Sequence, residues 1–242
     1  MRDSAEILTD PPPPAADARV AYGREPLQFG DLRVPRGEGP FPLAVVLHGG
    51  YWQATYNLIH TGHLSEAFRD AGIATWNLEY RCVGIPDGGW PAAREDLTLA
   101  LAFLGELPVE RTATVLLGHS AGGQLALWAA KRAQLPVLAL APVSDVRDAV
   151  ERRGPESAPG RFMAAEQFAE GSPIELLPLG VPTIVIHGTD DDDVPYSMSD
   201  RYVAAADGEA ELVTLEGTGH FELIDPLAPA FAQTVVAVKR LL

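Results

Sequence analysis

A serine set among glycines is the residue of this sequence best placed to do chemistry. Ser120 lies in GHSAGG, Gly118 to Gly123, between an apolar run and a segment with helical periodicity. Small neighbours let a buried strand turn sharply into a helix, whose N-terminus favours a developing negative charge. Glycine-rich turns also bind phosphates, but neither Gly-x-Gly-x-x-Gly nor the P-loop lysine is present. We interpret Ser120 as a nucleophile, against the alternative of a structural serine in a tight turn.

A serine hydroxyl is a weak nucleophile and needs a base, for which the chain offers six histidines. His220 follows a predicted strand, on the glycine-rich loop EGTGHF near the end of the sequence. A loop there can place an imidazole beside the Ser120 turn, so we expect His220 to be the base. The other five are expected to have different roles: His60 and His63 as surface or packing residues, His119 inside the turn and pointing away from Ser120, and His48 and His187 as structural hydrogen-bonding residues at strand ends.

The base needs a carboxylate to fix its tautomer and stabilise the imidazolium. Four consecutive candidates, Asp190 to Asp193, follow the apolar run PTIVIHG, and Asp145 stands at the end of the preceding strand. The pattern alone does not choose among them. Calcium binding is an alternative for the aspartate run, but the spacing and glycine of an EF-hand are absent.

Acyl transfer also needs backbone N–H groups directed at the developing oxyanion. One should be the N–H of Ala121, the residue after the nucleophile. Others should come from HGGYW, His48 to Trp52, where glycines let the backbone approach a substrate. A simple β-turn is the alternative for the glycine pair alone.

The elements that must position these residues alternate between strand and helix. Short apolar runs indicate buried strands, and periodic segments between them indicate helices. The expected strands are 27–35, 43–50, 73–80, 113–118, 136–145, 182–188 and 210–217, and the expected helices are 64–71, 90–104, 122–133, 197–206 and 225–242. This alternation predicts an α/β domain with a mostly parallel sheet. In such sheets ligands bind beyond the carboxyl ends of the strands, where the candidate residues stand.

Composition limits the domain organisation and the partners. The 242 residues suit one domain, 20–242, preceded by a proline-rich arm, 1–19, that is extended or disordered. Residues 146–179 lose the regular pattern and are expected to form a short lid-like excursion. The net charge of −15 argues against nucleic acid and anionic membranes, and a monomer or a homodimer both remain open.

The compartment is expected to be cytoplasmic. The single cysteine, Cys82, cannot form an internal disulfide, and we expect it to be a packing residue. The N-terminus has no apolar region of the kind found in signal peptides. No stretch approaches the roughly 18 apolar residues of a membrane span.

Together, HGGYW, GHSAGG, HGTDDDDVP and GTGHF resemble the α/β-hydrolase superfamily from about Val20 to the C-terminus. Within it the chain looks like small serine esterases and kynurenine formamidase-like hydrolases that carry His-Gly-Gly-x-Trp. The resemblance implies a parallel sheet flanked by helices on both faces, with at most a short lid. It also implies oxyanion donors at Gly50 and Tyr51, and it selects Asp191 as the acid through His-Gly-x-x-Asp-x-x-Val-Pro. We further expect Trp52 and His119 to lie at the substrate pocket.

The predicted function is hydrolysis of small carboxylic esters through an acyl-enzyme, with no metal and no organic cofactor required. N-formylkynurenine-type amide hydrolysis is the alternative, because the same machinery would serve it. A peptidase is less favoured, since such enzymes usually carry an extra gating domain. A non-catalytic binding protein on the same fold is the rival from another class.

Overall fold

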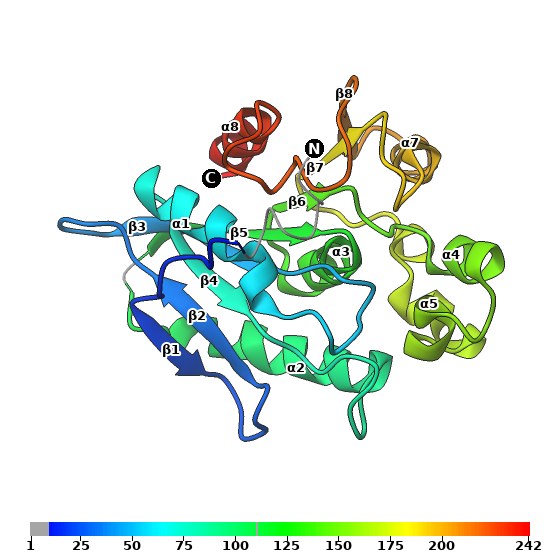
Figure 1. The fold of residues 1–242 in the computed structure, drawn as a ribbon, viewed down its shortest axis with the longest axis horizontal. Coiled ribbons are helices and arrows are strands. Elements are labelled where there is room, and N and C mark those ends of the chain that lie inside the picture. The colour runs from blue at the N-terminus through cyan, green and yellow to red at the C-terminus, as the bar shows by residue number, and fades with distance from the viewer. Residues whose placement is uncertain (1–9, 110) are drawn as a thin grey trace.

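A single mixed sheet organises the computed structural model, which describes residues 10–109 and 111–242 (Figure 1). Its eight strands lie in the order β1-β2-β4-β3-β5-β6-β7-β8. The pairings of β1 with β2 and of β2 with β4 are antiparallel, and all later pairings are parallel. The strands are β1 (Ala18–Ala21), β2 (Phe29–Arg33), β3 (Phe41–Leu47), β4 (Ala74–Leu78), β5 (Arg111–His119), β6 (Val137–Leu140), β7 (Thr183–Gly188) and β8 (Ala210–Leu215).

Helices cover both faces of this sheet, as Figure 1 shows. The longer ones are α1 (Gly62–Asp70), α2 (Trp90–Phe103), α3 (Ala121–Ala133), α4 (Val146–Arg153), α7 (Tyr196–Ala205) and α8 (Phe231–Leu241). Shorter elements are η2 (Leu58–Thr61), η3 (Leu104–Glu106), α5 (Ala158–Phe162), η4 (Ala165–Gln167), α6 (Phe168–Gly171) and η5 (Pro173–Leu176). The predicted fold class, an α/β-hydrolase fold with a mostly parallel sheet, is confirmed.

Alternation along the central strands creates two cores. In β3, Val45 and Leu47 pack on one face with residues of α2, α3 and α7. Ala44 and Val46 pack on the other face with α1 and α8. Because both faces are covered, the strands carry continuous apolar runs, as expected for parallel strands.

The last helix begins later than the sequence suggested. We expected a helix over 225–242, but α8 starts at Phe231. The Asp225 carboxylate accepts a hydrogen bond from the Leu227 N–H at 2.9 Å and closes a turn instead. Pro229 restricts the residue before it to extended conformations, which favours a helix start beyond it.

The described part of the proline-rich arm lies against the domain. The Pro11 carbonyl oxygen is 2.8 Å from Nε2 of His63 on α1, and Pro14 O accepts from Arg33 Nη2 at 2.8 Å. Strand β1 begins at Ala18, two residues before the expected start of the domain. The first nine residues of the expected arm lie outside the described residues.

The excursion over 146–179 is a chain of short helices rather than irregular coil. It is fastened to α3, where Gln124 Nε2 donates to the Gly171 carbonyl at 2.8 Å and Trp128 Nε1 donates to Glu170 O at 3.0 Å. Among the described helices, none is long and apolar enough to cross a bilayer.

Candidate active site

Ser120 occupies a strained turn between β5 and α3. Its backbone has φ 57° and ψ −120°, outside the regions that side chains other than glycine commonly adopt. The Ser120 N–H donates to Leu140 O at 2.8 Å, and its carbonyl accepts from Gly123 and Val143 N–H at 2.9 and 3.1 Å. The turn is thus held from both sides by backbone bonds, which is how such strain persists in a folded protein.

The glycines around Ser120 are required by close backbone approach. A Cβ on Gly118 would lie 2.0 Å from Gly122 O, and one on Gly122 would lie 2.1 Å from Leu47 O. A Cβ on Gly123 would come within 2.7 Å of the Pro142 side chain. These contacts involve atoms that cannot move aside cheaply, so the sequence-based explanation for GHSAGG holds in the structure.

His220 and Asp191 are brought together although 29 positions separate them. His220 Nδ1 lies 2.6 Å from Asp191 Oδ2, and the Asp191 side chain is fully buried. The other carboxylate oxygen, Oδ1, accepts from the N–H groups of Asp193 at 2.9 Å and Val194 at 2.8 Å. The turn between β7 and α7 therefore fixes Oδ1, and His220 from the loop after β8 occupies Oδ2.

None of the other acidic candidates contacts His220 in the described structure. Asp145 is the N-cap of α4 and accepts from the Asp148 N–H at 3.0 Å. Asp190 and Asp192 are exposed. Asp193 lies at the cavity and accepts a hydrogen bond at its carbonyl from Tyr51 Oη. Geometry thus singles out the aspartate that the family pattern indicated.

His187 is a second neighbour of Asp191 that sequence reasoning did not place there. Its Nε2 is 3.0 Å from Val194 O and 3.1 Å from Asp191 Oδ2, and its Nδ1 is 2.7 Å from Ser199 Oγ. If the Ser199 hydroxyl donates to Nδ1, the Nε2–H is left to be shared between the Val194 carbonyl and the Asp191 carboxylate. The position of His187 four residues before Asp191, at a strand end, is the signal that could have revealed this pair.

Burial alone would raise the pKa of the Asp191 carboxyl. Hydrogen bonds from His187, His220 and the Val194 N–H outweigh burial and hold its pKa well below the usual range. The carboxylate is therefore ionised wherever the protein is folded under ordinary conditions. An ionised Asp191 keeps the proton of His220 on Nδ1 and leaves Nε2 free to accept one.

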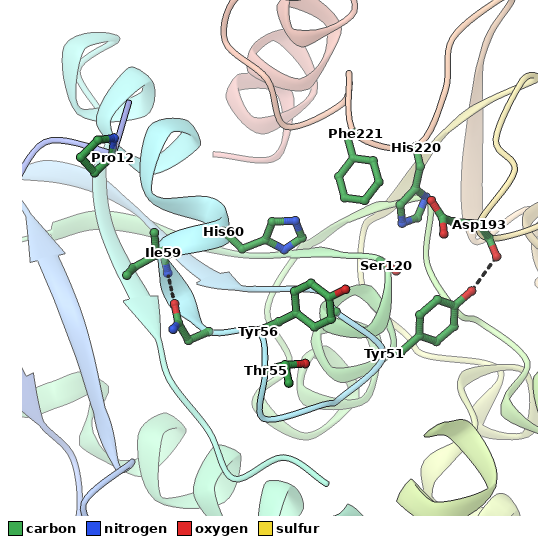
Figure 2. A pocket seen from close by; sticks show the side chains of 12 residues that line it. Pro12, Tyr51, Thr55, Tyr56, Ile59, His60, Ser120, Asp193, His220 and Phe221 are labelled. Atoms are coloured by element: carbon green, nitrogen blue, oxygen red, sulfur yellow. Dashed lines mark hydrogen bonds between the residues drawn. The ribbon is translucent and has the colours of Figure 1, made fainter. Parts of the chain in front are cut away.

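Ser120 and His220 open onto the same cavity of about 470 Å³ (Figure 2). Both are nearly buried, with 2% and 6% of their surface exposed. The described residues that line the cavity are Pro12, Gly50, Tyr51, Thr55, Tyr56, Asn57, Ile59, His60, Ser120, Asp193, His220 and Phe221. The cavity is of a size that suits a small organic molecule.

Two family models match the chain. The BD-FAE model matches residues 31–150. The model of the prolyl oligopeptidase family matches residues 94–225, more than half of the chain. The chain belongs to the prolyl oligopeptidase family of α/β-hydrolases. The resemblance to the α/β-hydrolase superfamily is thereby confirmed, while the matches do not single out the formamidase-like group.

Several solved structures similar to this α/β-hydrolase are esterases by name. A truncated carbohydrate esterase from gut microbiota is 16% identical, with a TM-score of 0.78 over 95% of this chain and 98% of that one. Esterase B from Lactobacillus rhamnosis (HN001) is 18% identical, with a TM-score of 0.78 over 99% and 95%. A thermophilic esterase from Thermogutta terrifontis is 21% identical, with a TM-score of 0.75 over 94% and 91%. At these identities the likeness shows the fold. None of the curated proteins compared with the chain matches it.

The loop HGGYW of this hydrolase passes directly beside Ser120. A Cβ on Gly49 would lie 3.1 Å from that of Ser120. Gly50 and Tyr51, the expected oxyanion donors, line the cavity with φ 103° and φ 48°. Ala121 is the first residue of α3, so its N–H has no acceptor within the helix. Gly50 and Tyr51 therefore line the same cavity as Ser120, and Ala121 follows Ser120 directly in the chain.

Two expected pocket residues of the hydrolase lie elsewhere. Trp52 is fully buried, stacks on Phe162 at 4.4 Å and donates from Nε1 to Gln124 Oε1 at 3.0 Å. His119 is also fully buried, and its Nε2 lies 3.0 Å from the carbonyl oxygen of His220. Neither lines the cavity. Trp52 belongs to the hydrophobic core, and His119 contacts the backbone of the loop that carries His220.

The hydrolase pocket instead contains residues that the sequence did not indicate. Tyr56, Ile59 and Phe221 form apolar lining, and His60, expected on the surface or in packing, faces the cavity. Tyr56, Ile59 and His60 follow the HGGYW loop without regular periodicity, and Phe221 stands next to His220. No sequence pattern therefore marked them as pocket residues.

Proposed function

We propose that this protein hydrolyses small carboxylic esters by acyl transfer through Ser120, with His220 as base and Asp191 as the acid that orients it. The observation that carries the proposal is the 2.6 Å contact between His220 Nδ1 and Asp191 Oδ2 beside the cavity that Ser120 also faces. No direct hydrogen bond joins Ser120 Oγ to His220 in the described structure. Such contacts are often long before a substrate is bound.

The reaction would run in two balanced steps. Nε2 of His220 takes the proton of Ser120 while Oγ attacks the ester carbonyl, and the resulting oxyanion is held by the N–H groups of Ala121 and of the loop at Gly50 and Tyr51. His220 returns the proton to the leaving alcohol as the C–O bond breaks. A water molecule then gives its proton to His220, attacks the acyl-enzyme and releases the acid, with the proton going back to Ser120.

Replacement of the nucleophile tests this proposal. Ser120→Ala should lower kcat toward p-nitrophenyl esters by roughly 10⁴-fold or more while the folded structure is kept. Ser197→Ala, at an exposed serine of α7, is the matched control and should behave as the wild type. A Ser120→Ala protein with near-normal turnover would exclude the mechanism.

Labelling with an organophosphate gives an independent readout. A serine activated by an ionised Asp–His pair should form an adduct, which mass spectrometry would locate on the peptide containing Ser120. A wild-type protein that is folded and forms no adduct would favour a non-catalytic binding protein on this fold.

Amide hydrolysis is a second candidate for the same machinery. The His-Gly-Gly-x-Trp sequence supports an N-formylkynurenine-type substrate, and membership of the prolyl oligopeptidase family supports a peptide bond. Turnover of N-formylkynurenine and of a short prolyl peptide amide, compared with short p-nitrophenyl esters, would rank the three classes. Higher kcat/KM for either amide would replace the ester proposal.

A further inference from the structure

His60 is a buried polar group in the cavity wall that the proposed mechanism leaves unused. It belongs to η2, has 9% of its surface exposed and lines the cavity together with Ser120. In Figure 2 its ring projects from η2 into the space between Tyr56 and Phe221. It therefore faces the volume that a substrate of Ser120 would occupy.

The His60 ring differs from the other histidines in its hydrogen bonding. Within the described residues, each of the other five has a hydrogen-bonding contact through a ring nitrogen: His48, His63, His119, His187 and His220. Nδ1 of His60 is buried and has no partner there. Nε2 also has no hydrogen-bond partner there but is not buried, so it is the ring nitrogen that a ligand in the cavity can reach. A polar atom that a ligand would cover without a hydrogen bond costs about 1–3 kcal/mol, so this nitrogen favours a ligand that supplies the bond.

The surroundings of His60 determine what kind of group that ligand offers. Its ring centroid lies 5.7 Å from that of Phe221, 6.1 Å from that of Tyr56 and 5.9 Å from that of His119. Burial, assisted by His48 and His220, lowers the pKa of His60 to about 3. The imidazole is therefore neutral, with one N–H donor and one nitrogen acceptor.

The remaining lining disfavours an anionic substrate. Among the described residues that line the cavity there is no lysine or arginine, and the charged side chain present, Asp193, is negative. An anion would meet repulsion without a compensating cation. The wall thus suits an apolar body with one uncharged hydrogen-bonding group.

We propose that His60 is a specificity-determining residue that hydrogen-bonds an uncharged oxygen, such as a keto or ether oxygen, carried by the apolar part of the ester substrate. The inference rests on the proposed function and names the substrate class of the same site. The neutral imidazole donates to that oxygen, and a substrate with a methylene in its place leaves the nitrogen unpaired. Such a site discriminates against the analogue that lacks the group.

Pairs of esters of equal length measure this discrimination. On the acyl side, p-nitrophenyl levulinate is compared with p-nitrophenyl valerate, and the keto group is then moved along longer chains against matched alkanoates. On the alcohol side, methoxyethyl butyrate is compared with butyl butyrate. The quantity measured is the ratio of kcat/KM for the oxygenated ester to that for its alkyl match, in the wild type, His60→Phe and His60→Gln.

For at least one pair, His60→Phe should lower this ratio by about tenfold, the effect of one hydrogen bond. His60→Gln retains a donor and an acceptor and should lower the ratio less. Organophosphate labelling of Ser120 shows that each variant keeps its machinery, and if His60→Phe fails to fold, the ratio in His60→Gln decides. Unchanged ratios for every pair, with Ser120 still labelled, would overturn the role of His60 and leave the hydrolase proposal standing. A folded wild type that does not label would overturn both.

Discussion

The two walls of the cavity are built in different ways. The first, here called the catalytic wall because the proposed mechanism uses it, consists of Ser120 and His220, with the buried Asp191 behind them. These residues come from the ends of strands or the loops just after them. The second, here the facing wall, consists of Pro12, Tyr56, Ile59, His60 and Phe221 and comes mainly from the arm and the segment before α1. The catalytic wall is nearly buried, whereas Tyr56 and Ile59 are each 43% exposed.

Hydrogen bonding separates the walls further. Both oxygens of Asp191 are occupied, and the Ser120 backbone is bonded at its N–H and its carbonyl. On the facing wall neither ring nitrogen of His60 has a hydrogen-bond partner in the described structure. A wall whose aspartate and turn backbone are held by hydrogen bonds can keep the reacting atoms in one geometry, while a wall with an unpaired polar group is suited to selecting the molecule that binds.

The largest expected effect on activity comes from replacing Asp191, the proposed acid behind the catalytic wall. Asp191→Asn preserves shape but removes the charge that fixes the His220 tautomer. We expect kcat to fall by roughly 10³- to 10⁴-fold with little change in KM, because the interaction counts most when the imidazolium forms. Steady-state kinetics with a p-nitrophenyl ester measures it.

Asp192→Asn is the matched control, because Asp192 is the next residue in the same turn and is exposed. It should keep wild-type kcat. If the two variants lost activity equally, the acid could not be assigned to Asp191 alone. The 2.6 Å contact between His220 Nδ1 and Asp191 Oδ2 would then not identify the acid.

The catalytic wall was predictable from the sequence because its constraints are local. Gly118 and Gly122 stand where any side chain would strike a backbone oxygen, so the turn leaves a pattern of small residues. His220 follows a recognisable strand, and the family pattern picks Asp191 from the aspartate run. The alternation of strand and helix likewise predicted the parallel sheet that brings these residues to one edge.

The facing wall was not predictable because long-range packing decides it. Nothing in the sequence near Trp52 distinguishes a pocket residue from a core residue, and the structure buries it against Phe162. His60 looked like a surface or packing residue until η2 placed it at the cavity. Local pattern likewise misplaced the start of α8, where a turn at Asp225 competes with helix formation.

A second effect, of intermediate size, concerns the stability of the facing wall. The pKa of His60 is lowered to about 3 in the folded protein, so below its ordinary value of 6.5 the unfolded chain binds a proton that the folded one does not. Stability is therefore lost as the pH falls from about 6.5 toward 3. Between about pH 7 and pH 4.5, the wild type should lose about 2–3 kcal/mol more unfolding free energy than His60→Phe.

Urea unfolding at several pH values measures this difference. Other titrating groups, among them the buried His119, are present in both proteins, so the comparison isolates His60. His63→Phe, at the partly exposed histidine three positions on, is the control and should follow the wild type. Parallel curves of unfolding free energy against pH for the wild type and His60→Phe would mean that His60 is solvated. The facing wall would then contain no buried histidine, contrary to the comparison drawn above.

The smallest effect is expected at Tyr51, which links the HGGYW loop to the turn that holds Asp191 in the catalytic wall. Tyr51 Oη donates to the Asp193 carbonyl at 2.5 Å and accepts from Arg153 Nη2 at 2.6 Å, while the Arg153 guanidinium lies 4.2 Å from its ring centroid. Burial raises the pKa of Tyr51 to about 12, so the hydroxyl remains a donor. These contacts connect the HGGYW loop to the turn that holds Asp191.

Tyr51→Phe keeps the ring and removes both hydrogen bonds, leaving the residue at φ 48° less firmly held. In the proposed mechanism the loop N–H groups stabilise the oxyanion, so the loss should appear in kcat, by about fivefold to tenfold, with KM nearly unchanged. Tyr196→Phe removes a partly exposed hydroxyl that contacts Thr214 Oγ1 and should leave kcat unaltered. If Tyr51→Phe raised KM and left kcat intact, Tyr51 would be a residue that binds the substrate, and it would not be the link that positions the HGGYW loop.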